Sequence, residues 1–388
     1  MDWYPKRRFG DLPREMAARF PHLVGLVFNA QNWTFLEIDR EIDRASKALM
    51  SMGVGSGDHV ALWLNNRAEW IFLMFALARV GAVQIPVNTR FRTEDLKYVL
   101  NQSDACMLIT HDVSGPQDYQ GMAADVLALP QTGHLVNDPA YPMFRQLVIV
   151  GSANQGAVTW SDALSQGEGV SESALTQREA SVDPDAPVFI MYTSGTTGFP
   201  KGVVHSHKLI RNIEERAFRM GISEADTMLN YLPLFHAFAY SECALMSMVT
   251  GARQIVTETF DPDESLDLIA SEQVTLIHGF EAHLSGLCDA QEAKPRDVSS
   301  LRTGLFASGM HSATPVAYRG ARVLAPLTAL SAYGMTEVWV GAAVSALDDD
   351  EEHRLERSGY PAPGYEMRIV DPGTGDPIPT EMPGELQV

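Results

Sequence analysis

Eleven residues, Tyr192 to Gly202, combine four serine and threonine hydroxyls, three glycines and one lysine. They directly follow the apolar run 188–191, so we expect a buried strand to end in a turn here. Hydroxyl donors, closely approachable glycine backbone and a mobile ammonium suit the binding of a polyphosphate. The segment is not a Walker A loop, because Pro200 precedes Lys201 and a glycine follows it. The alternative is an ordinary Gly/Ser/Thr connection between a strand and a helix.

The pattern is longer than a glycine turn, and it resembles the phosphate-binding signature of the adenylate-forming superfamily. That superfamily holds acyl-CoA synthetases, firefly-type luciferases and the adenylation domains of peptide synthetases. The resemblance implies that ATP is bound here and that Lys201 is a catalytic cation. It also implies that the cofactor contacts the loop through Thr193, Ser194, Gly195, Thr196, Thr197 and Gly198.

A second motif, Tyr333-Gly334-Met335-Thr336-Glu337, follows an apolar run and joins an aromatic ring, a glycine, a hydroxyl and a carboxylate. Magnesium prefers hard oxygen ligands and often bridges a carboxylate to nucleotide phosphates, which suits Glu337. The resemblance implies that Tyr333 stacks on the adenine with Gly334 beside it, that Thr336 contacts the nucleotide, and that Glu337 helps to hold Mg²⁺. Without the first motif, an ordinary turn with a core tyrosine and a surface glutamate would be the better interpretation.

The phosphate loop itself offers a weaker second candidate ligand for Mg²⁺, the hydroxyl of Thr196. Two other stretches have metal-like residue types but the wrong spacing. No CxxC or HExxH pattern supports a transition-metal site at His205 and His207, and the acidic run 348–352 lacks the glycine and spacing of a calcium loop. We therefore expect no transition-metal or calcium site in either stretch.

The segment from Tyr231 to His236 ends a predicted strand with a histidine beside two aromatic residues. A single histidine in such a place is more often packed or at the solvent edge than catalytic. The resemblance places His236 near the acyl carboxylate, among the catalytic residues. We assign it a positioning role, because a carboxylate nucleophile is already ionised at neutral pH and needs no general base.

Ser308, Gly309 and Met310 follow another predicted strand. They occupy the place where the resembled family has a small-residue turn beside the adenine, so we include them in the cofactor site. The family pattern usually has more Gly, Ala or Pro here. Met310 and His311 therefore depart from it, which affects the expected shape of the pocket rather than the expectation of a bound nucleotide.

Composition and charge limit the function further. The chain has 388 residues and a net charge of −20, which argues against unaided binding to nucleic acid or anionic membranes. The three cysteines lie far apart and form no CxxC pair, which favours a reducing, cytoplasmic setting. The N-terminus shows no secretory signal, and the most apolar run, 71–78, is too short to span a bilayer. We expect no integral membrane segment.

Helical periodicity alternates with short apolar runs along most of the chain. Thr34 and Glu37 form a capping box before an amphipathic helix that ends at Gly53, a strand is predicted at 60–64, and Ser206 is a candidate helix cap. This alternation predicts an α/β fold of two αβ subdomains, with mainly parallel sheets covered by helices. We place their boundary near 151–187, a Gly- and Ser-rich connection with at most one short helix. From about 359, short pieces broken by Pro and Gly predict a small, incomplete β-barrel region.

The resemblance covers nearly the whole chain, and it identifies residues 1–388 as the large N-terminal domain of such an enzyme. Family members continue past this length with an Asp that binds the ribose, a hinge, and a small lid domain carrying a second lysine. We therefore expect this chain to be poorly active alone. The implied reaction is ATP-dependent activation of a carboxylic acid to acyl-AMP and pyrophosphate, followed by thioester formation with CoA in the full-length protein.

A fatty or medium-chain acid is our first choice of substrate, and an aryl acid the second. One alternative is a catalytically weakened protein that binds ATP or acyl-adenylate, and another is a luciferase-like oxygenase of the same superfamily. The expected partners are the small carboxylic acid, ATP and CoA, with no nucleic acid, and a homodimer stays open.

Overall fold

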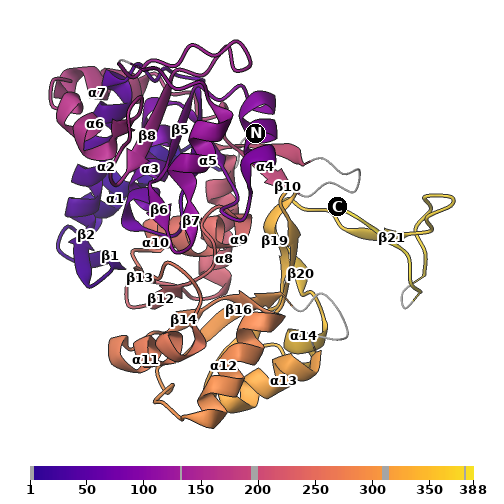
Figure 1. Cartoon of the computed structure of the whole chain (residues 1–388). Coiled ribbons are helices and arrows are strands. Elements are labelled where there is room, and N and C mark those ends of the chain that lie inside the picture. Colours follow the sequence, from indigo (N-terminus) through magenta and orange to yellow (C-terminus); the bar gives the residue numbers. More distant parts are fainter. Residues whose placement is uncertain (1–3, 132, 194–199, 308–313, 380–381) are drawn as a thin grey trace. The chain divides into compact units, whose positions relative to one another are not determined.

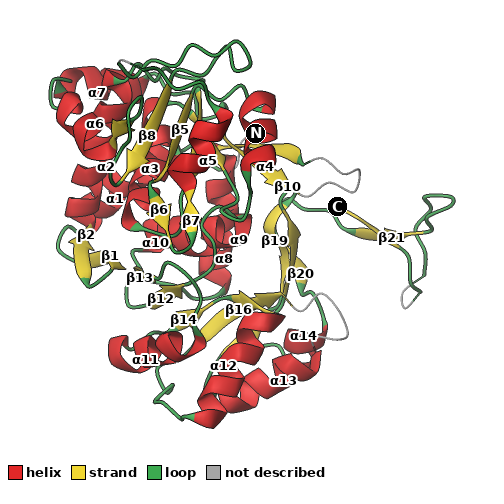
Figure 2. Ribbon diagram, in the orientation of Figure 1, coloured by secondary structure: helices red, strands yellow, loops and turns green. Residues whose placement is uncertain are grey.

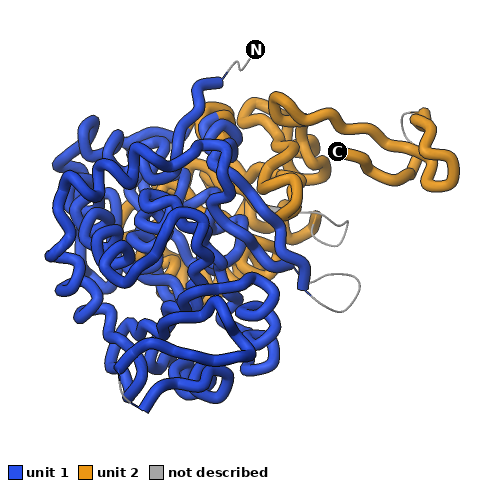
Figure 3. The backbone as a smooth tube through the Cα atoms, turned by 90° about the horizontal axis from the view of Figure 1, so that it is seen from above, with its two compact units in different colours: residues 1–214, 222–261 blue, residues 215–221, 262–388 orange. Residues whose placement is uncertain are grey.

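The computed structural model describes residues 4–131, 133–193, 200–307, 314–379 and 382–388. Contacts divide the chain into two compact units, drawn in different colours in Figure 3. Unit 1 holds residues 1–214 and 222–261, and unit 2 holds residues 215–221 and 262–388. The division falls inside one helix, α8 (Ile210–Arg219).

Unit 1 alternates strands with helices (Figures 1 and 2). Its helices are η1 (Phe9–Asp11), α1 (Leu12–Arg19), α2 (Phe35–Ser51), α3 (Ala68–Val80), α4 (Thr93–Gln102), α5 (Tyr119–Val126), α6 (Trp160–Gly167), α7 (Glu172–Ala180), η2 (His207–Leu209), α9 (Ala237–Ala239), the π-helical η3 (Tyr240–Leu245) and α10 (Met246–Thr250). Its strands are β1 (Val24–Phe28), β2 (Gln31–Thr34), β3 (His59–Trp63), β4 (Val83–Pro86), β5 (Met107–His111), β6 (Val113–Ser114), β7 (Gln117–Asp118), β8 (Gln146–Val150), β9 (Val158–Thr159), β10 (Pro187–Thr193), β11 (Lys201–Ser206), β12 (Thr227–Asn230) and β13 (Arg253–Val256).

The larger sheet of unit 1 has, among the described residues, the strand order β11-β10-β4-β3-β5-β8-β9. Its strands pair in parallel except at the edge, where β11 runs antiparallel to β10. The chain runs from β3 to β4 on one side of β3, and then crosses to β5 on its other side. Such a reversal at the carboxyl ends of parallel strands is where open α/β sheets usually bind ligands. The loop after β3, residues 64–67, lies at this point.

Helices cover both faces of this sheet. The apolar sides of α4 and α5 pack against every second residue of the strands. Together they form one core cluster, which includes Trp63 and Ile85. The right-handed connection from β3 to β4 places α3 on the opposite face, where α3 packs with α2 and α7. Because the strands are buried on both faces, they read as continuous apolar runs rather than as alternating ones. The predicted α/β class with parallel, helix-covered sheets is confirmed.

The helices opposite α4 and α5 are joined by a buried guanidinium. The Arg79 side chain is 1% exposed and contacts Asp39 at 2.6 Å, Asp43 at 2.7 Å and Glu179 at 3.2 Å. It also donates to the carbonyl oxygen of Gly10 at 3.0 and 3.1 Å. Three acidic side chains thus satisfy one buried cation, which fixes α2, α3 and α7 to one another.

A second group of strands in unit 1 follows the order β12-β13-β1-β2. Strand β13 pairs in parallel with β1 and β12, while β2 returns antiparallel to β1. The predicted capping box starts the next element. Thr34 accepts a hydrogen bond from the backbone of Glu37, whose carboxylate accepts from the backbone of Thr34, and α2 begins at Phe35. This local prediction is confirmed.

Unit 2 contains α11 (Pro262–Glu272), α12 (Glu281–Ala293), α13 (Thr314–Val323), α14 (Glu351–Glu356) and the strands β14 (Leu276–Ile277), β15 (Gly279–Phe280), β16 (Thr303–Ala307), β17 (Thr328–Leu330), β18 (Ala332–Met335), β19 (Trp339–Val344), β20 (Tyr360–Pro361), β21 (Arg368–Val370) and β22 (Glu385–Gln387). Strand β16 pairs in parallel with β14, β15 and β17. Strands β18, β19 and β20 form an antiparallel sheet, and β21 and β22 form a hairpin of their own. In the described part of the chain, the expected β region after residue 359 therefore belongs to two small sheets and closes no barrel.

Two stretches differ from the local prediction. The segment 151–187, expected to be a connection with at most one short helix, carries β9, α6 and α7 inside unit 1. Thr159 and Ser171 cap these two helices by accepting backbone hydrogen bonds. The segment 201–206 forms an edge strand, β11, which was not predicted. The predicted cap Ser206 is confirmed, because its side chain accepts from the backbone of Lys208 at the start of η2. The subdomain boundary near 151–187 stays a prediction.

Candidate functional site

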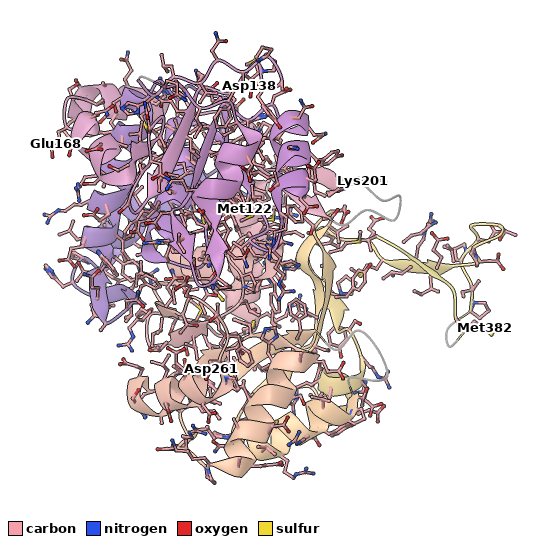
Figure 4. All side chains as sticks on the ribbon, in the orientation of Figure 1. Met122, Asp138, Glu168, Lys201, Asp261 and Met382 are labelled. Carbon is pink, nitrogen blue, oxygen red and sulfur yellow. The ribbon has the colours of Figure 1, made fainter. Side chains whose placement is uncertain are left out.

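The predicted phosphate loop joins two antiparallel strands, β10 and β11. Residues 188, 189 and 191 of β10 are at most 3% exposed, which agrees with the expected buried strand. Thr193 pairs directly with Lys201, so these two residues close the hairpin. Lys201 is exposed at the start of β11 (Figure 4). The predicted contacts Ser194, Gly195, Thr196, Thr197 and Gly198 lie outside the described residues.

Helix α4 contacts the hairpin on both sides of this closing pair. The Tyr98 hydroxyl donates to the carbonyl oxygen of Pro200 at 2.9 Å. The Tyr192 hydroxyl donates to the Gln102 side chain. Burial raises the pKa of Tyr192 to about 12, so this hydroxyl keeps its proton at neutral pH. Sequence reasoning missed Tyr98 and Gln102; their four-residue spacing on one helix face was the available signal.

His236 ends the loop that follows β12 and caps the short helix α9. Its Nδ1 accepts a hydrogen bond from the backbone N–H of Phe238 at 3.2 Å, and the backbone N–H of His236 donates to the carbonyl oxygen of Pro233 at 2.9 Å. The residue keeps an exposed edge, yet surrounding protein atoms desolvate the ring and lower its pKa below the ordinary value. A neutral ring that accepts at Nδ1 carries its proton on Nε2. His236 is therefore arranged as a hydrogen-bond donor rather than as a cation.

The loop that carries His236 is held by Asn66, from the end of β3. The Asn66 side chain is 4% exposed and donates to the carbonyl oxygens of Leu232, at 2.8 Å, and Thr257, at 3.1 Å. Its own oxygen accepts from the backbone N–H of Leu234 at 2.8 Å. A single buried amide thus satisfies three backbone groups that follow β12 and β13. Nothing in the local sequence around Asn66 signals these contacts.

The second motif forms a tight antiparallel hairpin in unit 2. Tyr333 and Gly334 lie on β18, while Thr336 and Glu337 lie in the turn before β19. Glu337 is exposed, whereas Tyr333 and Thr336 are half-buried. The backbone N–H groups of residues 338 and 339 donate back to the carbonyl oxygens of residues 335 and 336. The motif therefore presents an aromatic ring, a hydroxyl and a carboxylate from one short turn.

Packing against a neighbouring strand requires glycine at position 334, which the sequence did not predict. We expected its missing side chain to admit a ligand. A Cβ atom at Gly334 would lie 2.7 Å from the backbone nitrogen of Gly341 and 2.8 Å from the carbonyl oxygen of Trp339. The close approach is therefore that of the neighbouring strand β19. Tyr365 secures the turn itself, because its hydroxyl donates to the carbonyl oxygen of Val338 at 2.7 Å.

The predicted adenine turn Ser308, Gly309 and Met310 follows β16 directly and lies outside the described residues. Within the described residues, no group of three acidic, histidine or cysteine side chains is arranged to hold a metal ion. The assignment of Glu337 as a ligand of Mg²⁺ stays a prediction. No described helix is both long enough and apolar enough to cross a membrane.

His207, one half of the histidine pair, has a structural partner. Its side chain is buried, and its Nδ1 accepts from the backbone N–H of Phe9 at 3.0 Å. Burial lowers its pKa to about 4, so the ring is neutral at pH 7. His205 lies on β11, whereas His207 begins η2.

Comparison with known proteins extends these observations to the whole chain. A family model described as AMP-binding enzyme matches residues 13–388. The chain is 32% identical over 384 residues to YngI of Bacillus subtilis (strain 168), which its name assigns provisionally to the acyl-CoA synthetases; the match covers 97% of this chain and 70% of YngI. It is 28% identical over 381 residues to the acyl-CoA ligase SID4 of Ajellomyces capsulatus, covering 97% of this chain and 64% of SID4.

Among solved structures, the anthranilate CoA ligase AuaEII in complex with anthranoyl-AMP superposes with a TM-score of 0.85. The match covers 99% of this chain and 70% of AuaEII at 21% identity, so it shows the shared fold. The sequence matches establish the family as well as the fold, because the family model covers nearly the whole chain and the identity to YngI exceeds 30%. The chain therefore belongs to the family of AMP-binding enzymes.

Proposed function

We propose that this protein activates a carboxylic acid with ATP. A carboxylate oxygen attacks the α-phosphorus, a carboxyl–phosphate bond forms, and the bond between the α- and β-phosphates breaks to give acyl-AMP and pyrophosphate. In the full-length protein, the thiol of CoA then attacks the acyl carbon and AMP leaves. The observation that carries the proposal is the AMP-binding match over residues 13–388, with the phosphate signature ahead of the Tyr333–Glu337 motif.

The phosphate end of the reaction is assigned to the hairpin of β10 and β11. Lys201 holds an exposed ammonium at the closing pair with Thr193, where it can neutralise charge that develops on the departing pyrophosphate. Hydroxyls and backbone amides of residues 194–198 complete the phosphate contacts in this proposal. Mg²⁺ bound with ATP would supply further charge neutralisation, and Glu337 offers it a hard oxygen ligand.

The remaining roles follow from the chemistry of each side chain. His236 is neutral and carries its proton on Nε2, so it can donate a hydrogen bond to the substrate carboxylate and orient it. It need not remove a proton, because the carboxylate is ionised at neutral pH. Tyr333, Gly334 and Thr336 are assigned to the nucleotide, together with the turn 308–310.

We propose a fatty or medium-chain acid as the substrate. The two sequence relatives carry acyl-CoA names, whereas the aryl substrate belongs to a structural neighbour of 21% identity. An aryl acid is the second candidate. We also propose that residues 1–388, assayed without the lid domain that the resemblance implies, turn over slowly.

A panel of carboxylic acids, assayed for AMP and pyrophosphate, tests the proposal. The chain is compared with a version that includes the lid domain, and Lys201→Ala is compared with Lys208→Ala. Lys208 is a matched control, because it is an exposed lysine of the same region that pairs with Asp185 at 3.2 Å. We expect Lys201→Ala to lower the rate on the order of 100-fold, as loss of a transition-state charge contact does, and Lys208→Ala to stay within about twofold.

The same experiment separates the alternative functions. Calorimetric binding of ATP and an acyl-AMP analogue, without product from any acid even in the presence of the lid, would indicate a protein that has kept only nucleotide binding. Emission of light, or consumption of oxygen, would indicate an oxygenase. If the chain neither binds ATP nor makes AMP, the proposed function is wrong.

A further inference from the structure

We propose that Tyr98 and Gln102 on α4 are positioning residues for the closing pair Thr193 and Lys201, and that they determine how tightly the protein binds ATP. The proposal rests on the proposed function. Tyr98 contacts the carbonyl oxygen of Pro200, and Gln102 accepts from the hydroxyl of Tyr192. The Gln102 contact lies on β10, one residue before Thr193, and the Tyr98 contact lies at the residue that precedes β11.

The two α4 residues form one contact surface. Positions 98 and 102 are four residues apart, so their side chains lie one helical turn apart on the same face of α4. Helix α4 lies beside β10 in Figure 1. Tyr192 directly precedes Thr193, and Pro200 directly precedes Lys201, so each member of the closing pair has a chain neighbour that α4 contacts. Both bases of the loop are thus fixed to a single rigid element.

Helix α4 is itself well anchored. On its other side Leu96, Val99 and Leu100 are at most 2% exposed and belong to the core cluster shared with β3 and β4. A support that is packed into the core cannot shift without opening that core. Tyr98 and Gln102 therefore transmit the position of the sheet to the two ends of the loop.

Fixing the loop ends matters for the affinity of the site. A phosphate site binds more tightly when its contacting groups are held near the bound geometry before the ligand arrives, because less conformational entropy is lost on binding. Lys201 benefits most directly, since it follows Pro200 in the chain. Loss of either α4 contact should weaken ATP binding, although neither side chain is proposed to touch ATP.

The test measures the Kd of ATP with Mg²⁺ by titration calorimetry on the 388-residue chain. Tyr98→Phe removes only the hydroxyl. The matched control is Tyr119→Phe, which removes a tyrosine hydroxyl from the same core cluster, where it donates to Thr89 at 3.2 Å. We expect Tyr98→Phe to raise the Kd about threefold to tenfold, the effect of losing one hydrogen bond, and Tyr119→Phe to change it less than twofold.

Gln102 provides an independent check, because one substitution removes its acceptor oxygen and another keeps it. Gln102→Leu removes the acceptor for Tyr192 and should raise the Kd of ATP by a similar factor. Gln102→Glu keeps an acceptor oxygen and should bind ATP within about twofold of the unmodified chain. Thermal unfolding of every variant is measured alongside, because a role confined to folding would lower Tm without this pattern in Kd.

Three outcomes would overturn the inference. Normal ATP affinity in both Tyr98→Phe and Gln102→Leu refutes the positioning role alone and leaves the proposed function standing. Equal weakening in Tyr98→Phe and Tyr119→Phe assigns the effect to general destabilisation. Absence of ATP binding by the unmodified chain refutes the proposed function, and the role of these residues with it.

Discussion

Asn66 offers the sharpest test of how the loop that carries His236 is held. Asn66→Ala removes two donors and one acceptor that serve backbone atoms of Leu232, Thr257 and Leu234. The two leucines and the asparagine are at most 4% exposed, so water cannot readily replace the lost contacts. We expect this one substitution to destabilise unit 1 and to displace the loop.

The expected magnitude follows from the three contacts. Each net hydrogen bond contributes about 1 kcal/mol, and each buried backbone group left without a partner adds a desolvation cost of similar size. Partial relaxation of the loop recovers some of this cost, so we expect Asn66→Ala to lose about 2–4 kcal/mol. Asn66→Asp keeps the acceptor for Leu234 but turns a negative charge toward two carbonyl oxygens. It should therefore be at least as destabilising as the alanine variant.

Equilibrium unfolding in urea, followed by tryptophan fluorescence, measures the effect. Five of the six tryptophans belong to unit 1, so the signal reports mainly on that unit. Asn65→Ala is the matched control. The half-buried Asn65 is the next residue along the chain, and its side chain donates to Ser114 at 2.7 Å and to exposed Glu258 at 3.2 Å. Its loss should cost less than about 1 kcal/mol, because water can reach these partners.

Two results would refute this reasoning. A loss below about 0.5 kcal/mol in Asn66→Ala would mean that the loop does not depend on the amide. An Asn66→Asp variant as stable as the original chain would mean that the two carbonyl contacts are absent, since a carboxylate cannot donate to them. In either case the position of His236 would need another explanation.

Three further predictions concern buried charge and histidine protonation. Arg79→Met should cost about 3 kcal/mol in urea unfolding, because the buried charge of Asp39 then keeps only its longer contact with Arg14 at 3.4 Å, and a loss under about 1 kcal/mol would contradict this. His207 has a folded-state pKa of about 4 against an ordinary 6.5, so from pH 6.5 to 4 only the unfolded chain takes up its proton and stability falls by up to about 3 kcal/mol. His207→Gln can still accept from Phe9 and should make the free energy of unfolding depend less on pH in this range. An unchanged dependence would mean that His207 is not its cause. The pKa of His236 is lowered below the ordinary value of about 6.5, so the adenylation rate should show no inflection from this group above about pH 6.5, and an inflection there that disappears in His236→Asn would contradict this.

The sequence was most informative where structure or chemistry is local. Thr34 and Glu37 are three residues apart, and their reciprocal capping bonds formed as expected. It was less informative in 151–187, where Gly and Ser content obscured the caps Thr159 and Ser171, although both residue types are common helix starts. It also gave no sign that 201–206 would be an edge strand, because pairing with β10 depends on the partner rather than on the segment itself.

By itself, then, the sequence determined the α/β class, the family signature at Thr193–Lys201 and the candidate side chains. These depend on periodicity and on residue types within a few positions of one another. Only the tertiary structure decided what holds those side chains in place. Asn66 meets Leu232 across 166 residues and Tyr98 meets Pro200 across 102 residues. Such contacts leave no periodic trace in the sequence, because each partner is chosen by the packing of sheets and helices rather than by its neighbours in the chain.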